Sequence, residues 1–315
     1  EMSASLVGSE MCIRDSYTAK YVPSELPKPW KAFSSYKAGN IIAFMDNLMN
    51  NILYRSRYDE LSVHVATGLN AQTVFSDYPP EDLVNCDTFA VIDQILIKWL
   101  VERLVAEDTG AKLDELTIPQ LCEKRSKMHF GEKAGSRYQM LSSAYQMIQA
   151  GNYHCPDSFK DILRQYQETD SGLDYEYRRF YTAYDQIEDT TAFEPLRDLV
   201  ENIYTNEYLE TLLPKWNSAM QEPDAFTQLP LQRDFYARNI KNAKERTVVI
   251  ISDAMRYEVG KELFRRMQDD PKCSAKLEVQ LSMLPSYTRL GMAALLPHIE
   301  LTMTCLLYTS PSPRD

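Results

Sequence analysis

The hydrophobic pattern of this chain changes its period once, at Arg246, and that change limits the folds it can adopt. Before Arg246, apolar residues recur at spacings of three and four, as at Ile41, Phe44 and Leu48, which is the pattern of one α-helical face. After it, residues 247–251 form an unbroken β-branched run, typical of a strand buried on both faces of a parallel sheet. The sequence therefore predicts a mostly α N-terminal region followed by the start of an α/β parallel-sheet domain.

The helical pattern extends from Ala32 to about Ala243 and contains almost no strand-like alternation. Helices are predicted over residues 89–106, 135–150, 157–168, 174–188, 192–203 and 206–221. Breaks between them are predicted at Gly151–Asn152, Ser171–Gly172 and Pro223–Asp224, because these dipeptides favour turns.

Aromatic side chains gather in residues 175–184 and allow two interpretations. They could stack on nucleic-acid bases. Alternatively, four of them form one helical face that packs on a neighbouring helix with its hydroxyls at the rim: Tyr177, Phe180, Tyr181 and Tyr184. Packing is favoured, because only Arg178 and Arg179 add positive charge nearby.

The region after Arg246 alternates between strand and helix patterns. Apolar residues every four positions predict a helix over 255–267, alternation predicts a second strand over 277–281, and residues 288–296 read as a further helix. Residues 299–303 are interpreted as the start of a third strand. This order implies right-handed parallel connections. Ligands of such sheets bind beyond the carboxyl ends of the strands.

Asp253 and Thr288 follow the first two predicted strands, so both are candidate site residues. A carboxylate at a strand end suits a divalent cation. A hydroxyl at a helix N-terminus lies where free N–H groups and the helix dipole favour a phosphate. A metal beside that hydroxyl would lower its pKa and make it a nucleophile. The expected product is a phosphothreonine that water later hydrolyses.

Structural roles are the alternative for each of these residues. Asp253 could cap a helix that starts at Ala254, and Thr288 could cap its own helix, each contributing about 1 kcal/mol. Arg256 and Arg289 could contact phosphate oxygens or could form surface ion pairs.

Two other phosphate-handling classes fit less well. An apolar run that ends in aspartate also occurs in P-loop ATPases, but no GxxxxGK[ST] loop lies between Tyr17 and Lys244. A phosphatase with an aspartate nucleophile needs a second aspartate two residues after the first, where this chain has Met255.

The composition excludes some partners and compartments. The formal net charge of −11 gives no overall attraction to nucleic acid. No apolar run reaches the ~20 residues needed to span a bilayer, so no membrane contact is expected. The cysteines between the two chain ends form no CxxC pair and fit a reducing cytoplasm: Cys86, Cys122, Cys155 and Cys273.

Both ends of the chain resemble translated sequencing-library adapter. Leu6–Asp15 reads LVGSEMCIRD and Cys305–Asp315 reads CLLYTSPSPRD, and opposite strands of one DNA segment encode LVGSEMCIRD and CLLYTSPSPR. Such segments are excluded from fold reasoning. We therefore expect adapter-like artefacts at 1–16 and 305–315, a helical domain at 17–243, and the N-terminal part of a phosphatase-like α/β domain at 244–304.

The segments VVIISDAMRYEVGKEL and MLPSYTRLGMAALLP resemble the opening of the PglZ domain, a branch of the alkaline phosphatase superfamily. The helical region, with its IYTNEYLETLLPKW stretch, resembles the upstream part of PglZ proteins of type 1 BREX phage-defence systems. The resemblance implies an alkaline-phosphatase-like fold in which Asp253 matches the first metal-binding aspartate and Thr288 matches the metal-bound nucleophile. It implies a divalent metal, zinc first, with manganese or magnesium as alternatives.

The superfamily's remaining aspartate and histidine ligands would fall after Thr304, so the fold is expected to be incomplete. The resemblance therefore implies a metal-dependent phosphatase or phosphodiesterase of a BREX system that is inactive as this fragment. Its expected partners are other BREX subunits and a phosphate ester or nucleic acid. The alternative is a non-catalytic scaffold or interaction subunit of the same complex.

Overall fold

The computed structural model describes residues 18–22, 38–223, 225–227 and 229–301. The chain divides into two compact units: the first comprises Glu1–His154 with Leu173–Thr211, and the second comprises Cys155–Gly172 with Leu212–Asp315. The domain boundary predicted at Lys244 lies inside the second unit. The two adapter-like ends lie outside the described residues.

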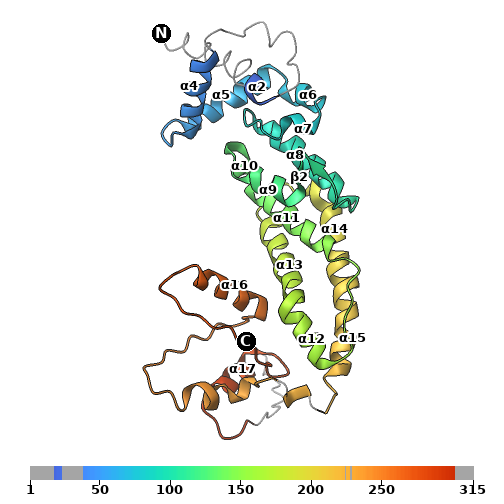
Figure 1. The fold of residues 1–315 in the computed structure, drawn as a ribbon, viewed down its shortest axis with the longest axis vertical. Helices are drawn as coiled ribbons and strands as arrows, with labels where there is room; N and C mark the ends of the chain where they lie inside the picture. Colours follow the sequence, from blue (N-terminus) through green and yellow to red (C-terminus); the bar gives the residue numbers. More distant parts are fainter. Residues whose placement is uncertain (1–17, 23–37, 224, 228, 302–315) are drawn as a thin grey trace, which may run out of the picture. The chain divides into compact units, whose positions relative to one another are not determined.

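The first unit is built from helices, as the apolar spacing predicted (Figure 1). In chain order they are α2 (Thr18–Tyr21), α4 (Ala38–Asn50), α5 (Arg55–Gly68), α6 (Ala71–Ser76), α7 (Pro80–Leu83), α8 (Ala90–Val105), α9 (Ile118–Ser126), α10 (His129–Lys133), α11 (Gly135–Gln149), α13 (Ser171–Tyr184), η3 (Thr191–Phe193), α14 (Glu194–Asn202) and the π-helical turn η4 (Ile203–Leu209). Phe180, Ala183 and Tyr184 of α13 belong to the same apolar core as the buried residues of α8.

Helix α8 packs against α11, α14 and α6 in this core. Its buried stripe recurs every four residues at Ile92, Leu96, Leu100 and Leu104, all of which are fully buried. The side chains at these positions lie above one another on a single helix face. Burying each of them stabilises the fold by about 1.5–3 kcal/mol.

A short antiparallel hairpin precedes α9 and was not expected from the sequence. Strands β1 (Lys112–Leu113) and β2 (Leu116–Thr117) pair through Leu113 and Leu116. Asp114 and Glu115 between them both have positive φ, as a two-residue type I′ turn requires. Two-residue strands are too short to produce a visible alternation. Thr117 then caps α9 through a capping box with Gln120.

A fully buried arginine, Arg125, forms hydrogen bonds with residues of α8 and of the loop before it. The Arg125 guanidinium donates to both carboxylate oxygens of Asp93, at 3.0 Å and 2.8 Å. It also donates to the Cys86 carbonyl oxygen at 2.7 Å, and Tyr138 donates its hydroxyl to Asp93 at 2.5 Å. Bidentate, charge-assisted bonds of this kind offset part of the cost of removing both charges from water.

The aromatic residues of α13 pack within the protein, so the packing interpretation is confirmed. Phe180 is fully buried, and the Tyr177 ring stacks on Tyr204 with centroids 3.7 Å apart. The hydroxyls of Tyr177 and Tyr181 both donate to Glu201, at 2.8 Å and 2.6 Å. Burial and this carboxylate raise the pKa of Tyr177 to about 12, which keeps the hydroxyl protonated and donating.

The second unit contains shorter elements joined by long extended segments. In chain order they are α12 (Phe159–Gln165), the π-helical η2 (Tyr166–Asp170), α15 (Glu210–Ala219), η5 (Ala225–Thr227), η6 (Gln232–Asp234), the π-helical η7 (Tyr236–Ile240), α16 (Tyr257–Gln268) and α17 (Thr288–Leu295). Helices α16 and α17 confirm the two helices predicted after Arg246.

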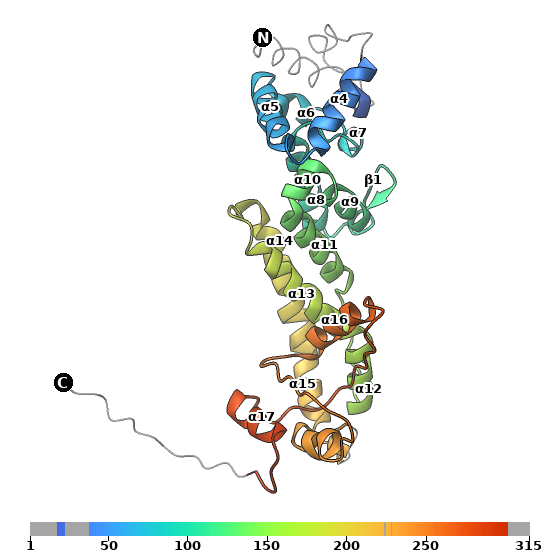
Figure 2. The same ribbon diagram turned by 90° about the vertical axis from the view of Figure 1, so that its left-hand side faces the viewer.

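The break predicted at Ser171–Gly172 is wrong, because η2 leads directly into α13. Helix α16 lies beside this junction (Figure 2), and Lys261 donates its ammonium group to the Gln167 carbonyl oxygen at 2.7 Å and to the Ser171 hydroxyl at 3.2 Å. Lys261 thus connects α16 to the junction between η2 and α13. Burial, with the nearby charge of Arg265, lowers the pKa of Lys261.

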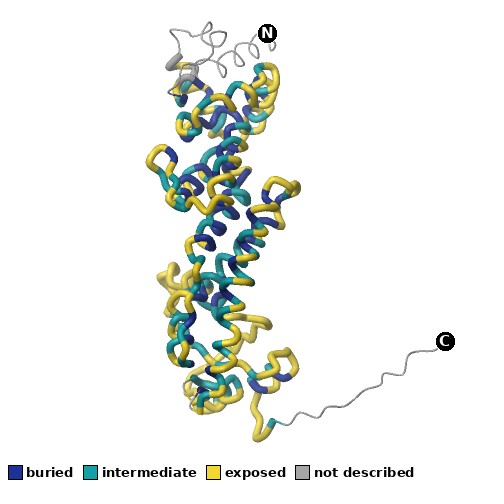
Figure 3. Tube along the Cα trace, turned by 90° about the vertical axis from the view of Figure 1, so that its right-hand side faces the viewer, coloured by how far each residue is buried: buried dark blue, intermediate teal, exposed yellow. Residues whose placement is uncertain are grey.

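The strands predicted at 247–251 and 277–281 are not formed in the described residues. Segment 247–251 is extended but pairs with no neighbour, and Val248 and Ile250 are 74% and 89% exposed. The second segment makes a single parallel bridge, between Leu231 and Leu281. A parallel strand exists only with partners supplied by distant crossovers. Without such partners, much of the C-terminal portion is exposed (Figure 3).

No helix in the described part of the chain combines the length and apolarity needed to cross a lipid bilayer.

Candidate functional site

Asp253 lies at a sharp turn between the extended segment 247–251 and helix α16. Ala254, the next residue, has a φ of 54°, a left-handed conformation that is uncommon for a residue other than glycine. Its backbone N–H donates to the Asp253 carboxylate at 3.0 Å. This contact fixes the direction of the carboxylate, and backbone conformations of this kind are found preferentially at functional sites.

Thr288 is the first residue of α17, directly after the N-cap residue Tyr287. The preceding loop contains a cis peptide bond between Leu284 and Pro285. Because the first N–H groups of a helix have no intrahelical acceptor, the backbone around Thr288 presents donors beside its hydroxyl.

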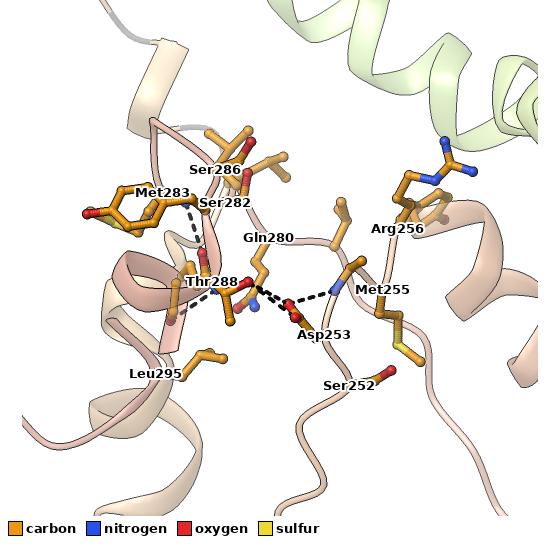
Figure 4. A pocket seen from close by; sticks show the side chains of 18 of the residues that line it. Ser252, Asp253, Met255, Arg256, Gln280, Ser282, Met283, Ser286, Thr288 and Leu295 are labelled. Carbon is orange, nitrogen blue, oxygen red and sulfur yellow. Dashed lines mark hydrogen bonds between the residues drawn. The ribbon is translucent and has the colours of Figure 1, made fainter. Parts of the chain in front are cut away.

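The structure brings these two side chains together. Thr288 Oγ1 lies 3.2 Å and 3.3 Å from the two carboxylate oxygens of Asp253 and donates to them (Figure 4). Both residues are exposed, and they come from segments separated by 35 residues. A hydroxyl and a carboxylate this close can contact one ion or one phosphate group.

Helix capping does not account for either residue. Helix α16 begins at Tyr257 with Arg256 as its N-cap, so Asp253 lies outside it. Thr288 is inside its helix rather than at the N-cap, and no side-chain capping bond forms at that N-cap. The capping interpretations are therefore wrong for both.

Gln232, in η6, positions the loop that carries Thr288. Its side-chain oxygen accepts the Met283 backbone N–H at 2.9 Å, and its amide group donates to the Gly291 carbonyl at 3.4 Å. Its backbone N–H donates to the Leu281 carbonyl at 2.8 Å. No sequence signal marked this residue, since a lone glutamine 56 positions before Thr288 fits many surface roles.

The two candidate arginines differ in their surroundings. Arg256 forms an ion pair with Glu258 at 2.8 Å, and this carboxylate is fully buried. Arg256 also lines a cavity of about 1020 Å³ that contains Asp253 and Thr288. Arg289 is exposed and does not line this cavity. Of the two arginines, Arg256 is therefore the one that shares the cavity with Asp253 and Thr288.

The donor atoms of the site suit a hard divalent cation, since a carboxylate and a hydroxyl are both oxygen ligands. Their number does not close a coordination sphere, because such ions take four to six or more ligands. Among the residues that the structure describes, no group of three or more His, Cys, Asp or Glu side chains is arranged to hold a metal ion.

Residues 234–308 match the model of the BREX system PglZ alkaline phosphatase-like domain. These residues belong to the PglZ domain family. The chain is also 34% identical over 289 residues to the alkaline phosphatase-like protein PglZ of Bacillus cereus (strain H3081.97), covering 88% of this chain and 33% of that protein. It is 30% identical over 280 residues to the alkaline phosphatase-like protein BrxZ of Escherichia coli O9:H4 (strain HS), covering 82% of this chain and 32% of that protein.

The chain thus spans about a third of the length of these PglZ and BrxZ relatives. No solved structure matches it. The PglZ match contains both Asp253 and Thr288, whereas the similarity to the two relatives also extends over most of the helical region. The resemblance predicted from the two sequence segments is therefore confirmed at the level of the family.

Proposed function

We propose that the chain is part of a metal-dependent phosphatase or phosphodiesterase that serves as a cytoplasmic subunit of a BREX phage-defence system. The observation that carries the proposal is the 3.2 Å contact between Thr288 Oγ1 and the Asp253 carboxylate inside a segment of the PglZ domain family. Other BREX subunits are the expected partners, since both relatives are alkaline phosphatase-like proteins named PglZ and BrxZ.

Thr288 is the proposed nucleophile and Asp253 the residue that orients it. The hydroxyl donates its hydrogen to the Asp253 carboxylate, which would take the proton as Oγ1 attacks phosphorus and the P–O bond to the leaving alcohol breaks. The phosphoryl oxygens would then face the first turn of α17, whose free N–H groups favour negative charge. Arg256 lines the same cavity, and we propose that it offsets further charge of the phosphate group.

A divalent cation, zinc or alternatively manganese or magnesium, would be held by Asp253 and Thr288, and it supplies Lewis-acid activation of the hydroxyl and of the phosphate. Since two oxygen ligands are too few for this purpose, we propose the activity for the full-length protein and expect the present chain alone to be inactive. Calorimetry should accordingly detect no tight binding of two zinc ions by this chain.

The test is hydrolysis of bis(p-nitrophenyl) phosphate by the full-length protein with Zn²⁺ or Mn²⁺. Thr288→Ala and Asp253→Ala should each lower kcat by about 100-fold or more, as loss of a nucleophile or its activating group does. Arg289→Ala is a matched control, because Arg289 neighbours Thr288 but lies outside the cavity. Undiminished turnover in both site variants would contradict the proposal.

A non-catalytic scaffold is the second candidate. It is favoured by the similarity to both relatives, which extends over most of the helical region outside the PglZ match. If this function is right, the full-length protein will hydrolyse no phosphate ester and will still bind its BREX partners when Thr288 is replaced by alanine.

A further inference from the structure

The cavity beside Asp253 and Thr288 has an apolar wall that comes from outside the PglZ match. Helices α12, η2 and α15 supply this wall, which consists of Ile162, Leu163, Tyr166, Leu212, Leu213 and Trp216. All six precede residue 234, where the family match begins. The helical region therefore contributes surface to the same cavity as the candidate nucleophile.

Contacts between α15 and the start of α12 hold this wall in place. Trp216 stacks on Phe159 with ring centroids 5.2 Å apart and an interplanar angle of 24°, and Phe159 is fully buried. Lys215, next to it, donates to the Cys155 carbonyl oxygen and to Asp157, both at 2.7 Å. These contacts hold α15 against the start of α12, so Trp216 has a fixed position before any ligand arrives.

The wall also keeps apolar surface available to a ligand. Leu213 remains 49% exposed although it lines the cavity, and Met255, which also lines it, is 47% exposed. Flexible methionine side chains adapt to ligands of different outline. Cavities of this size that combine apolar walls with a few polar groups are typical of small-molecule sites.

The charges of the cavity limit what kind of phosphate compound fits. Among the residues that line it, Asp253 and Arg256 are the charged ones, and Arg256 is already paired with Glu258. A nucleic acid needs several lysines or arginines along its backbone. One phosphate next to an apolar group matches this lining better than a chain of phosphates.

We propose that the cavity selects phosphate esters that carry an aromatic or large aliphatic substituent, with Trp216 and Leu213 contacting that substituent while the phosphate lies at Thr288. The inference rests on the proposed function and specifies its substrate class. Trp216 and Leu213 are specificity-determining residues and take no part in bond making.

The experiment uses the full-length protein with Zn²⁺ or Mn²⁺ and two diesters with the same leaving group, methyl p-nitrophenyl phosphate and 1-naphthyl p-nitrophenyl phosphate. The readout is the ratio of kcat/KM for the naphthyl ester to kcat/KM for the methyl ester. Trp216→Ala should lower this ratio by about 10-fold to 100-fold, as loss of a hydrophobic pocket contact does. Trp216→Phe should restore most of it.

Val63→Ala, an exposed apolar position on α5, is the control and should leave the ratio unchanged. An unchanged ratio in Trp216→Ala would overturn the inference, whether the two kcat/KM values stay the same or fall equally. An equal fall would indicate a purely structural role of Trp216.

A binding measurement separates this inference from the proposed function. In calorimetry, 1-naphthylphosphonate should bind the wild-type protein about tenfold or more tightly than methylphosphonate, with a negative heat-capacity change from apolar burial. Trp216→Ala should abolish the difference. If the binding preference appears but no ester is hydrolysed, only the proposed function fails. Equal binding of both phosphonates, or tighter binding of a single-stranded oligonucleotide that is indifferent to Trp216, contradicts the inference itself.

Discussion

The helical first unit buries its apolar side chains more completely than the segment 244–301 does. In the first unit, apolar residues such as Leu96 and Leu141 are fully buried, and backbone hydrogen bonds inside each α-helix join residues four positions apart. In 244–301, an equally apolar segment leaves Ile250 89% exposed. Helices need only a covered face, whereas parallel strands need neighbours from distant parts of a chain before any of their bonds form. The candidate site lies in the segment 244–301, where fewer apolar side chains are buried and the strands predicted at 247–251 and 277–281 are not formed.

Hydrogen exchange tests this contrast with the largest expected effect. Backbone amides of α8 and α11 should exchange slower than those of residues 247–251 by roughly three orders of magnitude or more, because opening free energies range from near zero to that of global unfolding. Exchange of this chain followed by mass spectrometry provides the measurement. Comparable protection of 247–251 would show that these residues form a paired strand after all.

Removing the buried arginine should destabilise only the well-packed side of the comparison. Arg125→Ala leaves Asp93 buried without its bidentate partner, so we expect a loss of about 3–5 kcal/mol in the free energy of unfolding. Thermal unfolding followed by circular dichroism measures it. Arg103→Ala is the control, because Arg103 is 44% exposed and should change stability by less than about 1 kcal/mol. Equal effects of the two variants would contradict the central role of this ion pair.

The same glycine substitution should have opposite consequences in the two regions. A Cβ on Gly131 would lie 1.7 Å from the Arg125 carbonyl oxygen, so Gly131→Ala should destabilise by about 1–3 kcal/mol. At Gly260, in α16, the nearest atom is Leu277 Cδ1 at 3.6 Å, and Gly260→Ala should stabilise that helix by up to about 1 kcal/mol. Urea unfolding of the two variants supplies the comparison. A destabilising Gly260→Ala would indicate that α16 is packed more tightly than its surroundings suggest.

A surface ion-pair cluster gives the smallest predicted effect and a pH dependence. Burial alone would raise the pKa of Asp59, but hydrogen bonds from Lys133 and His129 outweigh it and hold the pKa below its ordinary value of 3.8. The carboxylate therefore stabilises the fold above its ordinary pKa, and this contribution is lost as the pH falls through the lowered folded-state value.

Asp59→Asn should cost about 1 kcal/mol at pH 7, and the difference from the wild type should shrink as the pH falls below the ordinary pKa of 3.8. Urea unfolding at several pH values would reveal this trend. Glu60→Gln, which removes an exposed pair with Arg57, should stay within about 0.5 kcal/mol at every pH. A cost for Asp59→Asn that grows at low pH would reverse the assigned sign.

The sequence predicted the helices well because their signal is local. The four-residue spacing that marks α8 and α16 depends only on which face is covered. The strands could not be predicted as formed structure, since Val248 and its neighbours carry the right propensity but pairing depends on remote segments. The contact of Asp253 with Thr288 was expected from their positions after successive apolar runs. Gln232 and the Trp216 wall were missed, because neither has a motif and both act through tertiary placement.

The central claim is that Asp253 and Thr288 share one ion. The most direct measurement is a crystal structure of the full-length protein grown with Zn²⁺, in which anomalous scattering locates the metal. We predict an ion about 2.0–2.2 Å from a carboxylate oxygen of Asp253 and close to Thr288 Oγ1. Zinc bound elsewhere, with neither residue among its ligands, would contradict the account.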